Sequence, residues 1–327
     1  MKKKVALHNL GCKVNAYEVE AMQQLLENAG YETVPFEEGA DVYVINTCTV
    51  TNIADRKSRQ MLHKAKKMNP DAIVVATGCY AQADTEKLKE DTAVDLILGN
   101  NQKTQIVEAL EEYEKEHAKQ VQVIEINHTK EYEELSISST AEHVRAYIKV
   151  QDGCNQFCTY CIIPFARGRV RSRKIEEVLS EVETLAAKGY KEVVLTGIHL
   201  SSYGVDFPKE ERESLLSLIQ AVSRVEGISR IRLGSLEPRI ITEEFLEGIV
   251  KTGKVCPHFH LSLQSGCNKT LKNMNRRYSA QEYAEKCELI RKFYPVPALT
   301  TDVIVGFPQE TEEDFEESYE FVKKIHF

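Results

Sequence analysis

Three closely spaced cysteines constrain this chain more than any other feature. Cys154, Cys158 and Cys161 lie in the stretch Gly153–Cys161, with three residues between the first pair and two between the second. Cysteine thiolates hold iron–sulfur clusters, and a four-iron cluster usually takes four of them. Three ligands hold such a cluster and leave one iron open to another molecule. A structural zinc ion is the alternative, but it usually takes four protein ligands, and no nearby histidine supplies the fourth.

This stretch resembles the cluster motif of the radical S-adenosylmethionine (SAM) enzymes. In that superfamily the open iron binds the amino and carboxylate groups of SAM. The resemblance therefore implies a [4Fe–4S] cluster on Cys154, Cys158 and Cys161, with SAM as a cofactor. The non-enzyme alternative is an iron–sulfur or zinc scaffold without turnover.

Length and composition bound the remaining possibilities. A chain of 327 residues predicts two domains. No apolar run is long enough to span a bilayer, and Met1–Val5 does not lead into a signal-peptide core. We therefore expect a cytoplasmic protein with no membrane partner, whose nine cysteines serve metal binding or catalysis instead of disulfides. The net charge of −8 argues against broad non-specific binding of nucleic acid.

Residues 1–126 alternate between strand-like and helix-like segments, which predicts an open parallel α/β sheet. The expected strands are Val5–Leu10, Val42–Ile45, Ala72–Ala76, Val94–Leu98 and Val121–Ile126. Residues 127–142 are polar, acidic and then Ser-rich, and they are predicted to be an interdomain linker.

A cysteine stands in the turn after each of the first three of these strands. Cys12, Cys48 and Cys79 are far apart in the sequence. The carboxyl ends of parallel strands lie along one edge of a sheet, so the three thiols could converge there. Taken singly, each is more often a small buried hydrophobe. Taken together, they predict a second metal site.

The residues around these cysteines resemble the N-terminal domain of the methylthiotransferase family. The matching stretches are Leu10–Asn15, Asn46–Val50 and Thr77–Ala81. In that family the three equivalent cysteines hold an auxiliary [4Fe–4S] cluster. The resemblance therefore assigns such a cluster to Cys12, Cys48 and Cys79.

Residues 143–327 repeat a strand–helix pattern around the cluster motif. Strands are expected at Val144–Val150, Glu192–Thr196, Arg230–Leu233, His258–Leu263 and Thr300–Val305, and capping-box-like helix starts occur at Ser279 and Thr311. Radical SAM domains are partial (β/α)6 barrels, so the resemblance implies a barrel that is truncated here before its last strand. The active site of a barrel lies at the carboxyl ends of its strands, where the cluster motif falls.

Further matches to the superfamily fall at those same strand ends and imply contacts to SAM. Glycines and prolines also punctuate turns in any fold, which is the plainer interpretation of each match. The residues expected to bind SAM are Tyr160, Thr196, Gly197, His199, Ser235, Glu237, Gln264 and Gly306.

The stretch Pro164–Lys174 is strongly basic and contains no acidic residue. A charge run is usually a solvated loop, but arginine suits bidentate contacts to phosphate. This run follows the cluster motif in an otherwise acidic chain, so we expect it to contact the substrate or an RNA backbone. The residues concerned are Arg167, Arg169, Arg171, Arg173 and Lys174.

The resemblance covers nearly the whole chain and is greatest to the tRNA methylthiotransferases that act on N6-threonylcarbamoyladenosine at position 37, beside the anticodon. It implies that a radical from SAM takes hydrogen from the adenine, that the auxiliary cluster delivers sulfur, and that a second SAM supplies methyl. The implied partners are the tRNA anticodon stem-loop, an electron donor of flavodoxin or ferredoxin type and a sulfur source. Isopentenyladenosine in tRNA and an aspartate of ribosomal protein S12 are the alternative substrates.

The C-terminal RNA-binding domain of the family, a small β-barrel called TRAM, does not occur in this sequence. We expect the chain to be truncated and to bind tRNA weakly.

Overall fold

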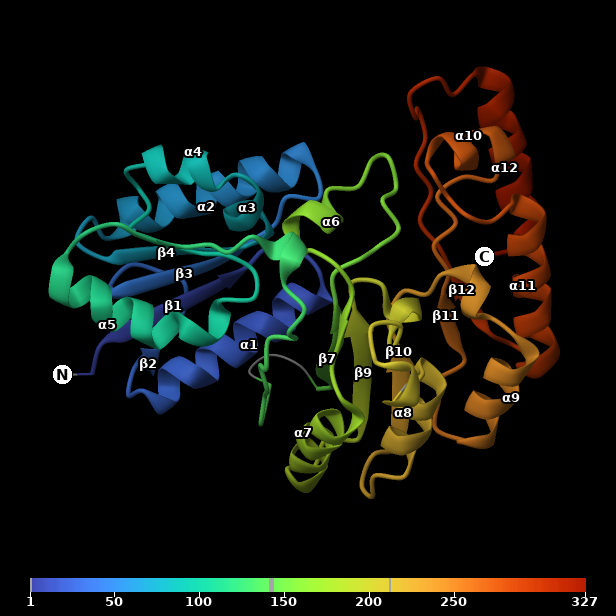
Figure 1. The fold of residues 1–327 in the computed structure, drawn as a ribbon, viewed down its shortest axis with the longest axis horizontal. Coiled ribbons are helices and arrows are strands. Elements are labelled where there is room, and N and C mark those ends of the chain that lie inside the picture. Colours follow the sequence, from blue (N-terminus) through green and yellow to red (C-terminus); the bar gives the residue numbers. More distant parts are fainter. Residues whose placement is uncertain (1, 141–143, 212) are drawn as a thin grey trace. The chain divides into compact units, whose positions relative to one another are not determined.

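The computed structural model describes residues 2–140, 144–211 and 213–327, and it divides into two compact units (Figure 1). The first unit comprises Met1–Glu142 together with Ile162–Arg169, and the second comprises His143–Cys161 together with Val170–Phe327. The short segment that follows Cys161 therefore packs with the first unit, although residues 143–327 were expected to form one domain. Its helix is α6 (Ile163–Ala166).

The first unit contains a six-stranded sheet in which all neighbouring strands are parallel, as the sequence predicts. The strand order is β2-β1-β3-β4-β5-β6. β3 is buried along its whole length, because its apolar side chains pack on both faces of the sheet. The strands are β1 (Lys4–Asn9), β2 (Glu32–Thr33), β3 (Val42–Thr47), β4 (Ile73–Gly78), β5 (Leu96–Leu98) and β6 (Gln120–Gln122).

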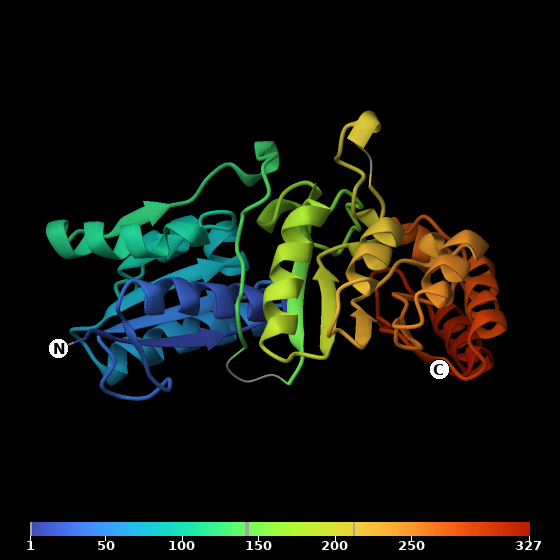
Figure 2. The same cartoon turned by 90° about the horizontal axis from the view of Figure 1, so that it is seen from below.

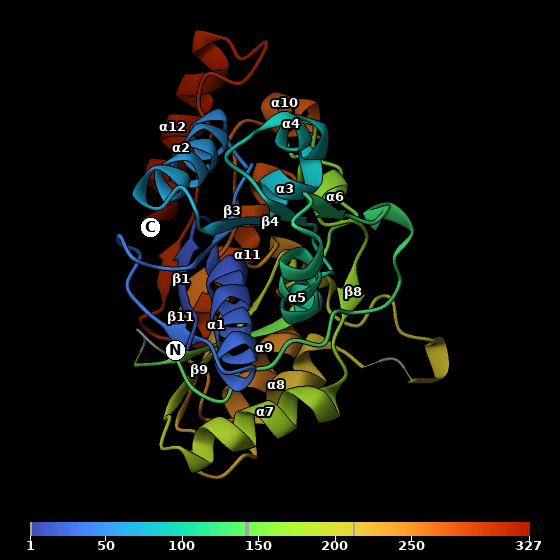
Figure 3. The same ribbon diagram turned by 90° about the vertical axis from the view of Figure 1, so that its left-hand side faces the viewer.

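Helices cover both faces of this sheet, with α1 and α5 on one face and α2, α3 and α4 on the other (Figure 3). Alternate residues of β3 serve the two cores: Tyr43 and Ile45 pack toward α2, and Val42 and Val44 pack toward α1. The helices are α1 (Lys13–Asn28), α2 (Asn52–Met68), α3 (Cys79–Ala83), α4 (Thr85–Glu90) and α5 (Ile106–Glu116), with 3-10 turns at Lys103–Gln105 and Ile126–His128.

The stretch predicted to be a plain linker packs against the first unit over its described part. The Tyr17 hydroxyl donates to the carbonyl of Leu135 at 2.5 Å, and Gln24 Nε2 donates to the carbonyl of Ser139 at 2.8 Å. Leu135 and Ile137 are buried. Residues 141–143, where the linker was expected to end and the next domain to begin, lie outside the described residues. The described stretch is thus an extension of the first unit.

The second unit is built from parallel βα repeats, like the barrel that the sequence predicts. One sheet has the order β10-β9-β7-β8, a second pairs β11 with β12, and isolated bridges such as Leu236–Leu261 join residues beyond β10 and β11. β8 is antiparallel to β7 and was not predicted. The strands are β7 (Ala146–Asp152), β8 (Arg171–Ser172), β9 (Glu192–Gly197), β10 (Arg230–Leu233), β11 (His258–His260) and β12 (Ala298–Thr300).

Helices follow these strands, and α7 lies along β7 and β9 (Figure 2). The capping boxes predicted at Ser279 and Thr311 are confirmed, and they begin α11 and α12. No helix in the described ranges is both long and apolar enough to cross a bilayer. The helices are α7 (Ile175–Ala187), α8 (Leu215–Ser223), α9 (Glu243–Lys251), α10 (Asn268–Asn273), α11 (Ala280–Phe293) and α12 (Glu312–Ile325), with 3-10 turns at Leu200–Ser202, Lys209–Glu211 and Pro238–Ile240.

Candidate metal centres

The three cysteines of the first unit come together at the carboxyl edge of its sheet. Cys12 immediately precedes α1, Cys48 follows β3, and Cys79 begins α3 directly after β4. Strands β1, β3 and β4 are neighbours, so the three turns are adjacent. Burial raises the pKa of both Cys48 and Cys12, and the nearby Cys79 raises both pKa values further. The thiol of Cys12 is thus surrounded by protein, although the residue as a whole reaches solvent. The sequence thus placed these thiols correctly, and their binding of a cluster stays a prediction.

A buried guanidinium lies against Cys79. Arg167 Nε donates to Cys79 Sγ at 3.2 Å, Nη1 to Glu18 Oε1 at 2.8 Å and Nη2 to Asn15 Oδ1 at 3.1 Å. The side chains of Arg167 and Glu18 are fully buried. A thiolate accepts such a bond strongly, whereas a thiol is only a weak acceptor. The geometry therefore suits Cys79 as a ligand of a cluster, since a metal-bound sulfur would accept this bond.

Lys103 extends this buried network. Its Nζ donates to Asn100 Oδ1 at 2.6 Å and lies 3.4 Å from Glu18 Oε2, and its side chain has no exposed surface. Asn100 Nδ2 in turn donates to the carbonyl of Ala166 at 2.6 Å, which fixes the segment that carries Arg167. The network holds two cations close to three thiols, and an anionic thiolate-bound cluster suits these surroundings.

The cysteines of the second unit lie on the loop after β7. Cys154 is buried, and burial raises its pKa to about 11, while Cys158 and Cys161 add to this shift. Ligand binding to iron removes the thiol proton, so a cluster would form here with release of protons. Asn275 supports the loop, because its Nδ2 donates to the carbonyl of Phe157 at 2.9 Å.

Arg276 is a part of this site that the sequence analysis missed. Its Nη1 donates to Cys158 Sγ at 3.3 Å, its Nε donates to the Tyr278 hydroxyl at 3.0 Å, and its guanidinium lies over the Tyr278 ring. Arg276 therefore donates a hydrogen bond to the sulfur of Cys158, as Arg167 does to the sulfur of Cys79. The run Asn275–Arg276–Arg277 was the available signal in the sequence. Its separation of 118 positions from Cys158 hid the connection.

Among the described residues, no three His, Cys, Asp or Glu side chains lie close enough together to hold a single metal ion. A four-iron cluster needs no such group, because each cysteine binds a different iron. Each unit brings three cysteines together and places an arginine that donates a hydrogen bond to one of their sulfur atoms. The residues fit the clusters that the family resemblance implies.

Several residues expected to bind SAM meet at the ends of β9 and β10. His199 Nε2 lies 3.5 Å from Glu237 Oε2, and the backbone N–H of His199 donates to Gln151 Oε1 at 2.8 Å. Burial alone raises the pKa of Glu237, but His199 and nearby arginines hold it below its usual value. Thr196 is buried and Gly197 half-buried on β9, whereas Ser235 is exposed. Glu237 is thus an anionic carboxylate at this end of the strands.

The other residues expected to bind SAM lie nearer the last strands. The ring of Tyr160 meets that of Phe307 edge to face, with centroids 6.2 Å apart, and this brings the cluster loop to the turn at Gly306. Gln264 has a left-handed backbone (φ 70°) and bridges to Val303. Contact of all these residues with SAM stays a prediction.

The structure corrects the interpretation of the basic stretch. Arg167, Arg171 and Arg173 are buried: Arg171 pairs with Asp152 at 3.7 Å and Arg173 pairs with Glu181. Buried guanidinium groups that pair with carboxylates present no surface to an RNA backbone, which argues against an RNA contact for these three, while their contact with another part of the substrate stays a prediction. Sequence alone could not show this, because their acidic partners lie outside the run. Arg169 and Lys174 are exposed, so their contact with the substrate or an RNA backbone stays a prediction.

Replacing Arg276 is expected to weaken the second-unit cluster site. Arg276→Met removes the donor to Cys158, and loss of such a supporting contact typically costs about 10- to 100-fold in metal affinity or activity. The measurement is the rate of iron loss to a chelator after anaerobic reconstitution. Arg277→Met, next along the chain, is the control. Equal rates for the two variants would contradict the role given to Arg276.

Two family models match the chain and together cover most of it. Residues 4–99 match an uncharacterized protein family, UPF0004, and residues 148–322 match the radical SAM superfamily. The chain therefore belongs to the radical SAM superfamily.

Curated relatives define the family more narrowly. The chain is 48% identical to threonylcarbamoyladenosine tRNA methylthiotransferase MtaB of Aquifex aeolicus, over 98% of this chain and 78% of the relative. It is 46% identical to MtaB of Bacillus subtilis, over 99% and 71%. A tRNA-2-methylthio-N(6)-dimethylallyladenosine synthase of Carboxydothermus hydrogenoformans is 36% identical, over 97% and 72%. Within the superfamily, the chain belongs to the tRNA methylthiotransferase family.

Solved structures support the same fold. The radical SAM methyltransferase TsrM from Kitasatospora setae, with tryptophan and a SAM analogue bound, has a TM-score of 0.68 at 16% identity, over 99% of this chain and 71% of that one. The cobalamin-dependent SAM radical enzyme OxsB scores 0.62 at 10% identity, over 98% and 52%. At such identities the likeness concerns the fold alone.

Proposed function

We propose that this chain is a methylthiotransferase that converts N6-threonylcarbamoyladenosine at position 37 of tRNA to its 2-methylthio derivative. The observation that carries the proposal is the pair of cysteine triads, each with an arginine that donates to a sulfur. Arg167 serves Cys79 at 3.2 Å and Arg276 serves Cys158 at 3.3 Å. The family relationship to enzymes named for this nucleoside supports the choice of substrate.

The two triads have different tasks in this proposal. The clusters and SAM, when bound, supply a radical, the inserted sulfur and the methyl group. Cys154, Cys158 and Cys161 hold the cluster that binds SAM, with Glu237, His199 and Tyr160 around the cofactor. Cys12, Cys48 and Cys79 hold the auxiliary cluster in residues 1–126. The buried Arg167 and the half-buried Arg276 fix the thiolates and keep their charge compensated.

The remaining partners follow from this chemistry. The substrate is the anticodon stem-loop of tRNA, whose unpaired bases can be turned outward and stacked. The reaction needs an external electron donor of flavodoxin or ferredoxin type and a source of sulfur. We therefore propose that the protein acts in the cytoplasm, where tRNA is modified.

The decisive test of the substrate is nucleoside analysis of tRNA from a deletion strain by mass spectrometry. We expect 2-methylthio-N6-threonylcarbamoyladenosine to disappear, its unmethylthiolated precursor to accumulate, and the gene for this chain to restore the product. The isopentenyladenosine derivative and ribosomal protein S12 should be unchanged. Loss of either of those instead would replace the proposed substrate with the one affected.

Anaerobic reconstitution tests the two-cluster arrangement. We expect about eight irons per chain and reductive cleavage of SAM, because each triad holds four irons. Replacing Cys12, Cys48 and Cys79 by Ala should leave about four irons and intact SAM cleavage, but no methylthiolation. Replacing Cys154, Cys158 and Cys161 by Ala should also leave about four irons and abolish SAM cleavage. A wild-type chain with about four irons and no cleavage would refute both the clusters and the catalysis.

A further inference from the structure

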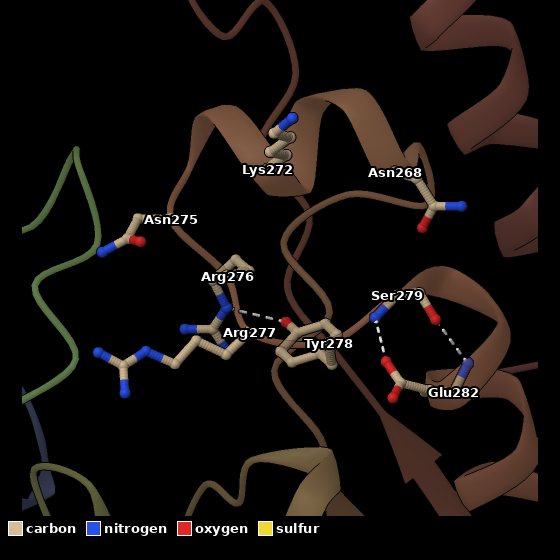
Figure 4. A pocket seen from close by; sticks show the side chains of 8 residues that line it. All are labelled: Asn268, Lys272, Asn275, Arg276, Arg277, Tyr278, Ser279 and Glu282. Atoms are coloured by element: carbon tan, nitrogen blue, oxygen red, sulfur yellow. Dashed lines mark hydrogen bonds between the residues drawn. The ribbon is translucent and has the colours of Figure 1, made fainter.

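A basic cavity lies beside the cluster loop of the second unit. It has a volume of about 400 Å³ and is lined by residues from α10, from the start of α11 and from the segment between them (Figure 4). Three of the lining residues are cations: Lys272, Arg276 and Arg277. Figure 4 shows the side chains of Arg276 and Arg277 extending to the same side of this segment, while the side chain of Lys272 projects separately from α10. In a chain with a net charge of −8, such a local group of cations stands out.

The one carboxylate that lines the cavity, Glu282, forms no ion pair with these cations among the described residues. Glu282 belongs to the capping box of α11: its Oε2 accepts the backbone N–H of Ser279 at 2.6 Å, and its own N–H donates to the Ser279 hydroxyl at 3.1 Å. Lys272 and Arg277 are exposed and form no ion pair with any described residue. Three cations thus line the cavity against one carboxylate, and one ammonium group and one guanidinium group are available to bind an anion.

Arg276 joins this cavity to the reaction centre. Its Nε and Nη1 are engaged by Tyr278 and by Cys158 Sγ, at 3.0 and 3.3 Å. Asn275 fixes the same segment to the cluster loop through the carbonyl of Phe157. An oxyanion of the RNA held by Lys272 or by Arg277 would thus lie in a cavity that Arg276, a residue that touches the cluster ligand, also lines.

We propose that Lys272 and Arg277 form an oxyanion-binding subsite for the RNA substrate, beside the SAM-binding cluster. This proposal rests on the proposed function, since it names which part of that substrate this cavity holds. Arginine binds oxyanions through a planar fork of donors, and lysine adds a point charge. Two groups of the substrate carry an oxyanion: a backbone phosphate, and the carboxylate of the threonylcarbamoyl group. The dimethylallyl group of the related substrate carries none.

The experiment measures RNA affinity by fluorescence anisotropy at fixed salt, with the full chain. Two anticodon stem-loops of one sequence are compared, one with N6-threonylcarbamoyladenosine and one with unmodified adenosine at the same position. The variants are Lys272→Gln, Arg277→Gln and the double variant. Arg224→Gln is the matched control, because it removes an exposed charge at the end of α8, away from the cavity. Melting temperatures confirm that each variant is folded.

We expect the double variant to lose affinity about tenfold, which corresponds to the loss of one charge-assisted bond. A loss confined to the threonylcarbamoylated RNA identifies the carboxylate as the bound group. An equal loss for both RNAs, with a shallower dependence on salt, identifies a phosphate. Affinities equal to those of Arg224→Gln for both RNAs would overturn the proposal.

The same assay separates this proposal from the proposed function. If the wild-type chain methylthiolates the modified stem-loop but the double variant binds it normally, the subsite is refuted and the function stands. If the wild-type chain methylthiolates neither RNA while the double variant still loses affinity, the function is refuted and the subsite stands.

Discussion

Arg167→Met is expected to destabilise the first unit by about 3–5 kcal/mol, the usual cost of breaking a buried ion pair by removing one partner. Arg167 is bonded to Glu18, Asn15 and Cys79 with no exposed surface. Methionine fills a similar space but offers no donor, so the Glu18 carboxylate would remain buried with less compensation. The Cys79 thiolate would lose its hydrogen bond in the same step.

Two readouts separate the effects of this substitution. Hydrogen exchange of α1 reports the stability of the first unit by itself, and iron retention reports the auxiliary site. Arg169→Met is the matched control, since it removes the same charge from an exposed position two residues away. Arg167→Lys should lie between them, because lysine keeps the charge but not the fork of donors. If α1 exchanged equally fast in Arg167→Met and Arg169→Met, the buried network would have no energetic importance.

The first unit could be predicted well from the sequence because each of its signals is local. Val42–Ile45 reads as a buried parallel strand, and its cysteine follows within a few residues. Since parallel strands end at one edge, the convergence of Cys12, Cys48 and Cys79 followed from position alone. The two-residue β2, with polar side chains, gives no such pattern and was missed.

Arginine roles could not be predicted, because they depend on partners far away in the chain. Arg167 and Glu18 are separated by 149 positions, and Arg276 and Cys158 by 118. In the sequence, a buried arginine cannot be told from an exposed one when the acidic residue that compensates its charge lies far away in the chain. For this reason the run after Cys161 was interpreted as an RNA contact, while the cavity beside Arg276 escaped notice.

The last strands of the second unit were shifted for a different reason. The strand predicted at Thr300–Val305 is Ala298–Thr300 in the structure. Beyond it, the isolated bridge between Gln264 and Val303 is the one β-pairing of this segment among the described residues, and Gln264 takes a left-handed backbone. The apolar residues Val303 and Val305 continue a strand-like pattern, but they are exposed past the end of the regular ladder. Hydrophobic pattern alone does not mark where the ladder stops.

Gly78→Ala is expected to cost about 2–5 kcal/mol, the sum of left-handed strain and overpacking. Gly78 ends β4 with a φ of 92°, directly before Cys79. An added Cβ would lie 2.3 Å from Asn46 Oδ1 and 2.6 Å from the carbonyl oxygen of Thr47. The Thr47 backbone belongs to the neighbouring strand and cannot move without disturbing the sheet. Only glycine allows Cys79 to turn toward the other two thiols here.

Gly30→Ala provides the control for this substitution. Gly30 has a similar φ of 96°, but an added Cβ there would meet no atom within 4 Å. It should therefore pay only the conformational cost of about 1–2 kcal/mol. The measurement is hydrogen exchange of β3 and β4, together with iron content after reconstitution. We expect Gly78→Ala to lose the auxiliary irons and keep those of the second unit, whereas Gly30→Ala keeps both. Equal protection of β3 in the two variants would show that the sheet yields to the Cβ, and that this close approach does not fix Cys79.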